Sequence, residues 1–247
     1  DSADKDIAGT LTLDGLTVDG GSIKLDGNYP TGTQNVALGD TALDSNVSGV
    51  NNTAVGSKAL TANTASDNTA VCTEAAAANT SGTANSIVGK RAFYTNTTGS
   101  NNSVLGAFSL FYNTSGGSNT AIGTSALQSN TTASNNTAVG YQAGYSITGS
   151  QYNTAIGRGA LYSHTTGNGG NVAVGYDANR SLTTGYNNVS VGSNAAYSTT
   201  TGLYNVALGD NALRSNTTAS NNTAVGYQAG YSKTTGDPIT AVGHQAL

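Results

Sequence analysis

Side chains that commonly perform catalysis are few in this sequence, and they are scattered. The two histidines, His164 and His244, stand beside no recurring serine or carboxylate, although nucleophilic catalysis requires a nucleophile, a base and an orienting group close together. Cys72 is the single cysteine, and no acidic residue recurs in the way that calcium-binding β-rolls require. We therefore expect no enzymatic activity, no catalytic or metal-ligating residue, and no cofactor.

Tyrosines offer better binding chemistry, because a phenol ring stacks on a sugar while its hydroxyl forms hydrogen bonds. Several tyrosines recur at equivalent places in a repeated sequence, which predicts weak glycan binding at many similar sites. The alternative is that these rings stack on one another and extend a thin core. The candidates for glycan binding are Tyr94, Tyr145, Tyr162, Tyr197 and Tyr231.

The repeated sequence is anchored by a glycine that follows an aliphatic residue, as in N-T-A-V-G-Y-Q-A at 136–143. Thirteen copies follow one another at 17 residues, apart from a spacing of 16 before Cys72, which replaces one glycine, and a spacing of 18 before Gly175. A fixed period of this length indicates a repeat architecture. The anchors are Gly39, Gly56, Cys72, Gly89, Gly106, Gly123, Gly140, Gly157, Gly175, Gly192, Gly209, Gly226 and Gly243.

Each copy predicts one coil of an all-β, parallel β-solenoid. The N-T-A-V segment is short, rich in β-branched residues and bounded by turn formers, so it predicts a strand of about four residues. We expect a second short extended stretch in the x-x-A-L after the anchor, and a polar return loop such as S-N-T-T-G-S-N. Thirteen coils stacked at about 4.8 Å each predict a rod of roughly 60 Å.

Asparagine stands four residues before the anchor in twelve of the thirteen copies. Stacking aligns these residues, which predicts a ladder of side-chain amides that also satisfies backbone groups in the turns. We assign them a structural role. They are Asn35, Asn52, Asn68, Asn85, Asn102, Asn119, Asn136, Asn153, Asn171, Asn188, Asn205 and Asn222.

The core of each coil is thin. It has about three apolar side chains, namely the valine and alanine of the strand and the leucine after the anchor, whereas ordering each residue costs on the order of 1 kcal/mol. Neighbouring strand residues point to opposite sides, so one strand column fills the coil while the other needs a cover. We expect other copies of the chain to provide that cover by homotrimerisation.

Two alternatives stay open. A left-handed helix of hexapeptides, a fold that carries many acyltransferases, requires an aliphatic residue every six positions, but Tyr145 and Gln151 follow Val139 at those steps. Ice binding is a minor alternative function, because threonine rows on a flat solenoid can order water. The residue three positions before the anchor is threonine in several copies, and valine or serine in the others interrupts the row. The threonines are Thr53, Thr69, Thr120, Thr137, Thr154, Thr223 and Thr240.

Composition excludes other classes of function. Only 9% of the 247 residues are charged, and seven acids balance seven bases from Asn35 onward. The repeats therefore lack the basic stripe that nucleic-acid binding requires, and we expect no nucleic-acid partner. No apolar run approaches the roughly 18 residues of a membrane-spanning helix, so we expect no membrane insertion.

The repeat N-T-A-V-G-Y-Q-A resembles the N-S-V-A-I-G-x-x-S repeats in the head domains of trimeric autotransporter adhesins. It is even more similar to the N-N-T-A-V-G-Y-x-A-L repeats of bacteriophage long tail fibres, and the resemblance covers Asn35 to Leu247. Both families imply a left-handed β-roll in a homotrimer that binds host surfaces. The resemblance thus implies a structural tail-fibre segment, a rigid spacer with attachment to host cell-surface polysaccharide as an additional role.

The chain divides into two parts at about residue 34. The segment G-T-L-T-L-D-G-L-T-V-D-G-G at 9–21 alternates apolar and polar residues with D-G turns, which predicts a β-rich connector over residues 1–34 before the repeat shaft or head over residues 35–247. This connector is similar to linkers in phage fibres and favours an extracellular location in a virion tail fibre. The alternative is a trimeric adhesin head on a bacterial cell surface, or a self-assembling extracellular filament.

Overall fold

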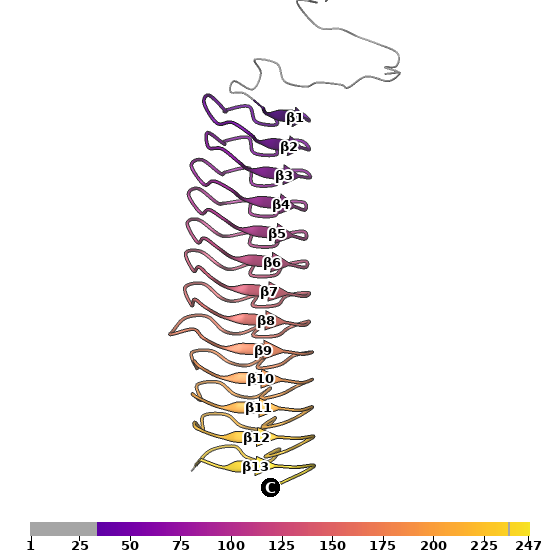
Figure 1. Ribbon diagram of the computed structural model, residues 1–247, viewed down its shortest axis with the longest axis vertical. Coiled ribbons are helices and arrows are strands. Elements are labelled where there is room, and N and C mark those ends of the chain that lie inside the picture. The colour runs from indigo at the N-terminus through magenta and orange to yellow at the C-terminus, as the bar shows by residue number, and fades with distance from the viewer. Residues whose placement is uncertain (1–33, 237) are drawn as a thin grey trace, which may run out of the picture.

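The computed structural model describes residues 34–236 and 238–247 as an all-β parallel solenoid (Figure 1). Thirteen strands stack in chain order as one parallel sheet of about twelve turns, which confirms the predicted all-β, parallel β-solenoid. The connector predicted over residues 1–34 lies outside the described residues, apart from Gln34. The strands are β1 (Val36–Leu38), β2 (Thr53–Val55), β3 (Thr69–Val71), β4 (Ser86–Val88), β5 (Ser103–Leu105), β6 (Thr120–Ile122), β7 (Thr137–Val139), β8 (Thr154–Ile156), β9 (Val172–Val174), β10 (Val189–Val191), β11 (Val206–Leu208), β12 (Thr223–Val225) and β13 (Thr240–Val242).

Each strand has three residues, with the middle side chain turned into the coil and the outer two turned away from it. Neighbouring strands pair in the same register even where the coil length changes. Thr53 pairs with Thr69 across the short coil, and Thr154 pairs with Val172 across the long coil. The return loops therefore absorb both changes in length, and the columns of equivalent strand residues stay aligned.

The segment after the anchor differs from the prediction. The prediction of a second extended stretch there was wrong, because the residues two and four positions after the anchor have left-handed backbones. Lys58 (φ 59°) and Leu60 (φ 50°) are typical, with the buried Ala59 between them. This alternation turns the chain tightly back beneath the strand and brings both the alanine and the leucine into the core.

The anchor glycine is required by stacking as well as by its backbone angle. Gly140 has φ 133°, and a Cβ on it would lie 2.7 Å from the carbonyl carbon of Gly157 in the next coil. An L side chain rarely adopts this angle, and the contact is with backbone that cannot move aside. Cys72 occupies the anchor position with φ 103°, so this coil holds a side chain in a conformation that favours glycine.

The core consists mainly of small side chains. The middle strand residue and the residue three after the anchor are mostly buried alanines, and larger side chains such as Phe93 and Leu161 fill the remaining space. The apolar core is divided into two clusters between Leu182 and Ala195. Asn179 and Ser190 enter the core near this division, and their buried polar side-chain atoms have no hydrogen-bond partner.

The predicted Asn residues form the strand Asn column, which comprises the twelve residues from Asn35 to Asn222 named above. All are buried. In each coil the Oδ1 atom accepts the backbone N–H of the equivalent residue in the next coil at 2.8–3.2 Å, and Ile239 makes this contact at the last one. In most coils Nδ2 donates to a carbonyl oxygen of the return loop, as Asn102 does to Gly116 at 3.1 Å.

A second buried column, the loop Asn column, lies eleven residues after the first. Its amides bond to one another, with Nδ2 of Asn96 2.6 Å from Oδ1 of Asn79 and Nδ2 of Asn113 2.8 Å from Oδ1 of Asn96. After Asn130 other residues interrupt it. The column comprises Asn46, Asn63, Asn79, Asn96, Asn113, Asn130 and Asn216, and its replacements are Ile147, His164, Leu182, Thr199 and Lys233.

A threonine follows this column in nearly every coil. From Thr64 to Thr217 each hydroxyl donates to the carbonyl oxygen of the equivalent threonine in the next coil, at 2.8–3.4 Å. These contacts secure the corner of the return loop. The sequence interpretation did not include either this threonine column or the loop Asn column, although both recur with the period that revealed the anchor.

Candidate binding surfaces

The outward side of the sheet, which we call the strand face, carries an aliphatic stripe. The strand face is formed by the first and third residues of the thirteen strands, and the stripe by the third, which is always valine, isoleucine or leucine. Several of these side chains are 38–50% exposed, among them Leu38, Leu105, Ile122, Ile156 and Val191. Scattered exposed apolar residues are ordinary, but a continuous apolar patch of this length is typical of an interaction surface.

Charge is concentrated on a different surface, the charged face. It consists of the residues one, two and five positions after the anchor. Every charged side chain of residues 34–236 and 238–247 stands at one of these positions, except Asp67 and Lys233. Glu74 and Arg91 form an ion pair along this face, and their contact lowers the pKa of the glutamate. The strand face, in contrast, contains no charged residue among the described strands.

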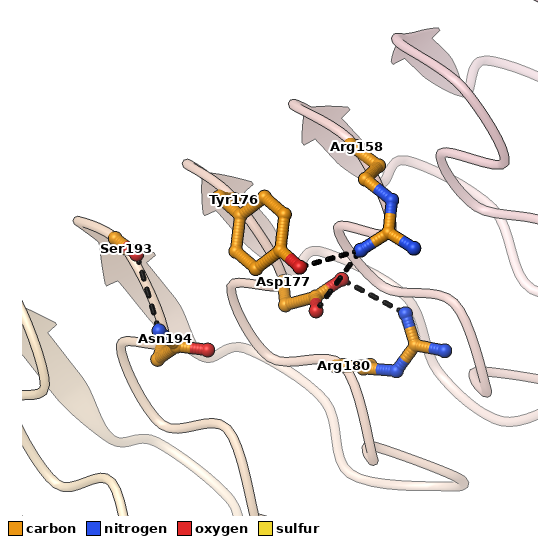
Figure 2. A network of polar contacts seen from close by, with 6 residues as sticks. All are labelled: Arg158, Tyr176, Asp177, Arg180, Ser193 and Asn194. Carbon is orange, nitrogen blue, oxygen red and sulfur yellow. Dashed lines mark hydrogen bonds and ion pairs between the residues drawn. The ribbon is translucent and has the colours of Figure 1, made fainter.

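Figure 2 shows a polar network of the charged face, around Asp177. The nearly buried carboxylate lies between two guanidinium groups, with Nη1 of Arg180 at 2.8 Å and Nη1 of Arg158 at 3.6 Å. Arg158 also donates to the hydroxyl of Tyr176 at 2.6 Å. Gly159 leaves the space that this network needs, because a Cβ there would lie 2.1 Å from Oδ1 of Asp177.

The predicted glycan-binding tyrosines lie in the same face, five positions after their anchors, and all five are half-buried. Ring centroids lie 5.3 Å apart between Tyr94 and Phe111, and 5.1 Å apart between Tyr145 and Tyr162, with nearly parallel planes. The guanidinium of Arg214 lies 5.5 Å from the ring centroid of Tyr197 and 5.9 Å from that of Tyr231. These contacts cover ring faces within the column, and Arg214 also donates to the hydroxyl of Tyr231 at 3.3 Å.

Self-stacking thus accounts for much of the tyrosine column, while glycan contact through its edges stays a prediction. A groove of about 440 Å³ lies where the column begins, against Tyr94, Glu74 and Lys58. Other tyrosines are more exposed than those of the column. They are Tyr112, Tyr141, Tyr152, Tyr176, Tyr204 and Tyr227.

The residues considered for catalysis lie in unlike surroundings. His164 takes a place in the loop Asn column, fully buried, with Nε2 2.8 Å from Oγ of Ser150. Burial lowers its pKa to about 4. His244 is exposed, with its ring stacked 5.2 Å from that of Tyr227, and Cys72 is a half-buried free thiol.

No group of three or more His, Cys, Asp or Glu side chains in the described part of the chain is arranged to hold a metal ion. The same residues contain no helix of the length and apolarity needed to cross a membrane. No protein-family model matches the sequence, and comparison with curated proteins and with solved structures finds no similar chain.

Proposed function

We propose that this chain is a non-enzymatic structural segment of an extracellular fibre, of the kind found in phage tail fibres. In this proposal three left-handed rolls pack in parallel through their strand faces. The charged face then points outward, where it can contact host-surface glycans. The resulting homotrimer is a rigid spacer, and the resemblance of the repeat to trimeric fibre and adhesin families supports the number of copies.

The observation that carries the proposal is the separation of the strand face from the charged face. An aliphatic column runs along the whole described sheet, while charge is excluded from it. Covering the exposed half of one such side chain contributes about 1 kcal/mol in each coil, and thirteen strands repeat this gain in register. A charged side chain at the same interface loses its hydration without a partner.

Native mass spectrometry of the intact chain tests the proposal, and we expect the mass of three copies. The variant Ile122→Asp, which places a carboxylate on the strand face, is expected to shift the mass toward that of one copy. Thr124→Asp is a matched control, because it introduces the same charge at an exposed site two residues away on the charged face. A folded monomer would overturn the proposed assembly, and a dimer would overturn the number of copies.

Ice binding competes for the same surface. The threonines of the predicted row occupy the first strand position and therefore lie on the strand face beside the aliphatic stripe. A homotrimer packed through this face covers them. A thermal-hysteresis assay distinguishes the two, since activity in the intact chain that Ile122→Asp abolishes would favour ice binding over a buried interface.

A further inference from the structure

The longest coil of the rod lines a hollow together with the return loop before it. This coil runs from Asn153 to Asn171 and is one residue longer than the usual period. Its loop between β8 and β9 projects beyond the other loops in Figure 1. The Asn153 amide donates to Ser150 and Gln151 rather than to its own return loop. A hollow of about 360 Å³ lies beside this loop, lined by Gly149, Gln151, Tyr152, Gly167, Asn168 and Gly169.

Tyr152 stands at this hollow with the left-handed backbone that is usual at its position in the repeat. Its φ is 60°, at a position that in several other coils holds asparagine, such as Asn101 and Asn135, which tolerates a left-handed backbone. The side chain is 67% exposed.

The ring of Tyr152 is also free. Tyr204 holds the equivalent position three strands later in the chain order, between β10 and β11, but its ring packs edge-on against Tyr186 at 5.5 Å. Tyr152 has no such ring contact within the described residues. Of the two equivalent tyrosines, it is therefore Tyr152 whose faces are available to a ligand.

The rest of the lining is open and uncharged. Gly149 stands where the coil before it has Thr132, and a Cβ on Gly149 would meet no atom within 4 Å. The exposed side-chain amides of Gln151 and Asn168 make no hydrogen bond within the described residues, so their donors and acceptors face solvent. The hollow thus combines an aromatic platform with two free amides and exposed glycine backbone.

We propose that this hollow binds one neutral pyranose unit of a surface polysaccharide, stacked on Tyr152 and hydrogen-bonded by Gln151 and Asn168. A volume of about 360 Å³ lies at the small end of ligand pockets, which span roughly 300–1,000 Å³. The lining contains no charge to pair with an acidic sugar. The proposal rests on the proposed fibre function, in which a homotrimer would present three such sites and gain avidity from them.

The test measures retention of the intact chain on immobilised mannan, galactan and dextran, with alginate as an acidic comparison. We expect retention on at least one neutral polysaccharide, reduced about tenfold by Tyr152→Asn through loss of the aromatic platform, which corresponds to about 1.4 kcal/mol. Gly149→Thr, which fills the hollow with the residue of the preceding coil, is expected to have the same effect. Tyr204→Asn is the matched control and leaves retention unchanged.

Three results would overturn the glycan site. They are retention on alginate alone, no retention on any of the four polysaccharides, and neutral retention that neither Tyr152→Asn nor Gly149→Thr reduces. If Tyr176→Ala instead abolishes retention, the charged face is the glycan-binding surface. Native mass spectrometry of each variant separates this failure from failure of the fibre proposal, because a trimeric mass without sugar binding leaves the spacer role standing.

Discussion

The two buried asparagine columns have the same side chain and the same period, yet only one of them persists along the rod. The strand Asn column continues from Asn35 to Asn222, while the loop Asn column is interrupted from Ile147 onward. The difference lies in what each amide satisfies. A strand asparagine accepts a backbone N–H of the next coil, whereas a loop asparagine bonds to other asparagines and to its own loop.

One carbonyl oxygen shows why the loop column can be replaced. The oxygen of Gly99 accepts Nδ2 of Asn85, from the strand column, at 3.0 Å and Nδ2 of Asn96, from the loop column, at 3.1 Å. In the coil where Ile147 replaces the loop asparagine, the equivalent oxygen of Ser150 still accepts Asn136 at 2.9 Å. Loss of a loop asparagine therefore leaves this backbone group paired.

Where the loop column is interrupted, the core is rearranged. The coil that has Ile147 in the loop column also has Gly144 in place of the usual leucine. A Cβ on Gly144 would lie 3.1 Å from Cδ1 of Ile147. The large side chain has moved across the coil and fills the same space. In the coil after β9 the two residues are exchanged: Asn179 takes the place of the usual leucine, and Leu182 takes the place of the usual asparagine. The buried side-chain amide of Asn179 has no hydrogen-bond partner.

The largest expected effect on stability comes from His164, a fully buried ionisable side chain in the loop column. Its folded pKa of about 4 lies below the ordinary value of 6.5, so the unfolded chain binds more protons between these two pH values. The contribution of the neutral His164 to the free energy of unfolding is fully present above about pH 6.5. It is lost as the pH decreases toward 4, by about 3 kcal/mol in total.

We expect His164→Asn, which restores the residue of the column, to remove this loss. Urea unfolding across pH 4 to 7 measures it, with His244→Asn at an exposed site as the control. If wild type and His164→Asn lose the same stability on acidification, the buried histidine is not its source.

A matched pair of deletions tests the difference between the columns directly. Asn119→Ala leaves the backbone N–H of Asn136 without its acceptor and is expected to lower the free energy of unfolding by about 2 kcal/mol. Asn113→Ala leaves its backbone partner, the carbonyl oxygen of Gly116, still bonded to Asn102. We expect this variant to lower the free energy of unfolding by about 1 kcal/mol.

Hydrogen exchange of the Asn136 amide, compared in both variants, measures the local effect. Faster exchange at this amide in Asn119→Ala than in Asn113→Ala is the expected result. Equal exchange in the two variants would show that the strand column is no more important to the backbone than the loop column.

The smallest expected effect is that of exchanging Asn179 and Leu182. The double variant Asn179→Leu with Leu182→Asn restores the usual order, removes a buried unpaired amide from the core and gives the polar residue a place in the loop column. We expect it to gain about 1 kcal/mol, while each single variant loses stability through overpacking or a cavity.

A double-mutant cycle on the midpoint of urea unfolding measures this coupling. Additive single effects would mean that the two positions do not compensate each other.

Much of the fold follows from the sequence because stacking requires the same residue at the same place in each coil. The period of the anchor predicted the parallel solenoid and placed the strand asparagines on one line. The backbone after the anchor was less predictable, because Leu60 has a left-handed conformation that its intrinsic preference opposes. Only the contacts of the stacked coils impose it.

The candidate surfaces were harder to predict than the fold. Tyr94 and Phe111 could be aligned from the sequence, but whether their rings lie face to face depends on packing. The hollow at Tyr152 lies beside the longer loop, and one inserted residue in the sequence does not reveal in which direction a loop moves. Gly149, which leaves that hollow open, has no distinguishing neighbour in the sequence.

The axial direction of the hydrogen bonds gives the rod a particular response to force. The strand pairs, the strand asparagines and the threonine column all join one coil to the next, so tension along the rod loads the bonds between two coils together. A coil that opens releases 17 residues, roughly 58 Å of chain at about 3.4 Å per residue, for the loss of about 4.8 Å of rod. The rod therefore extends under load in discrete steps, and a few opened coils absorb a sudden pull while the others remain stacked.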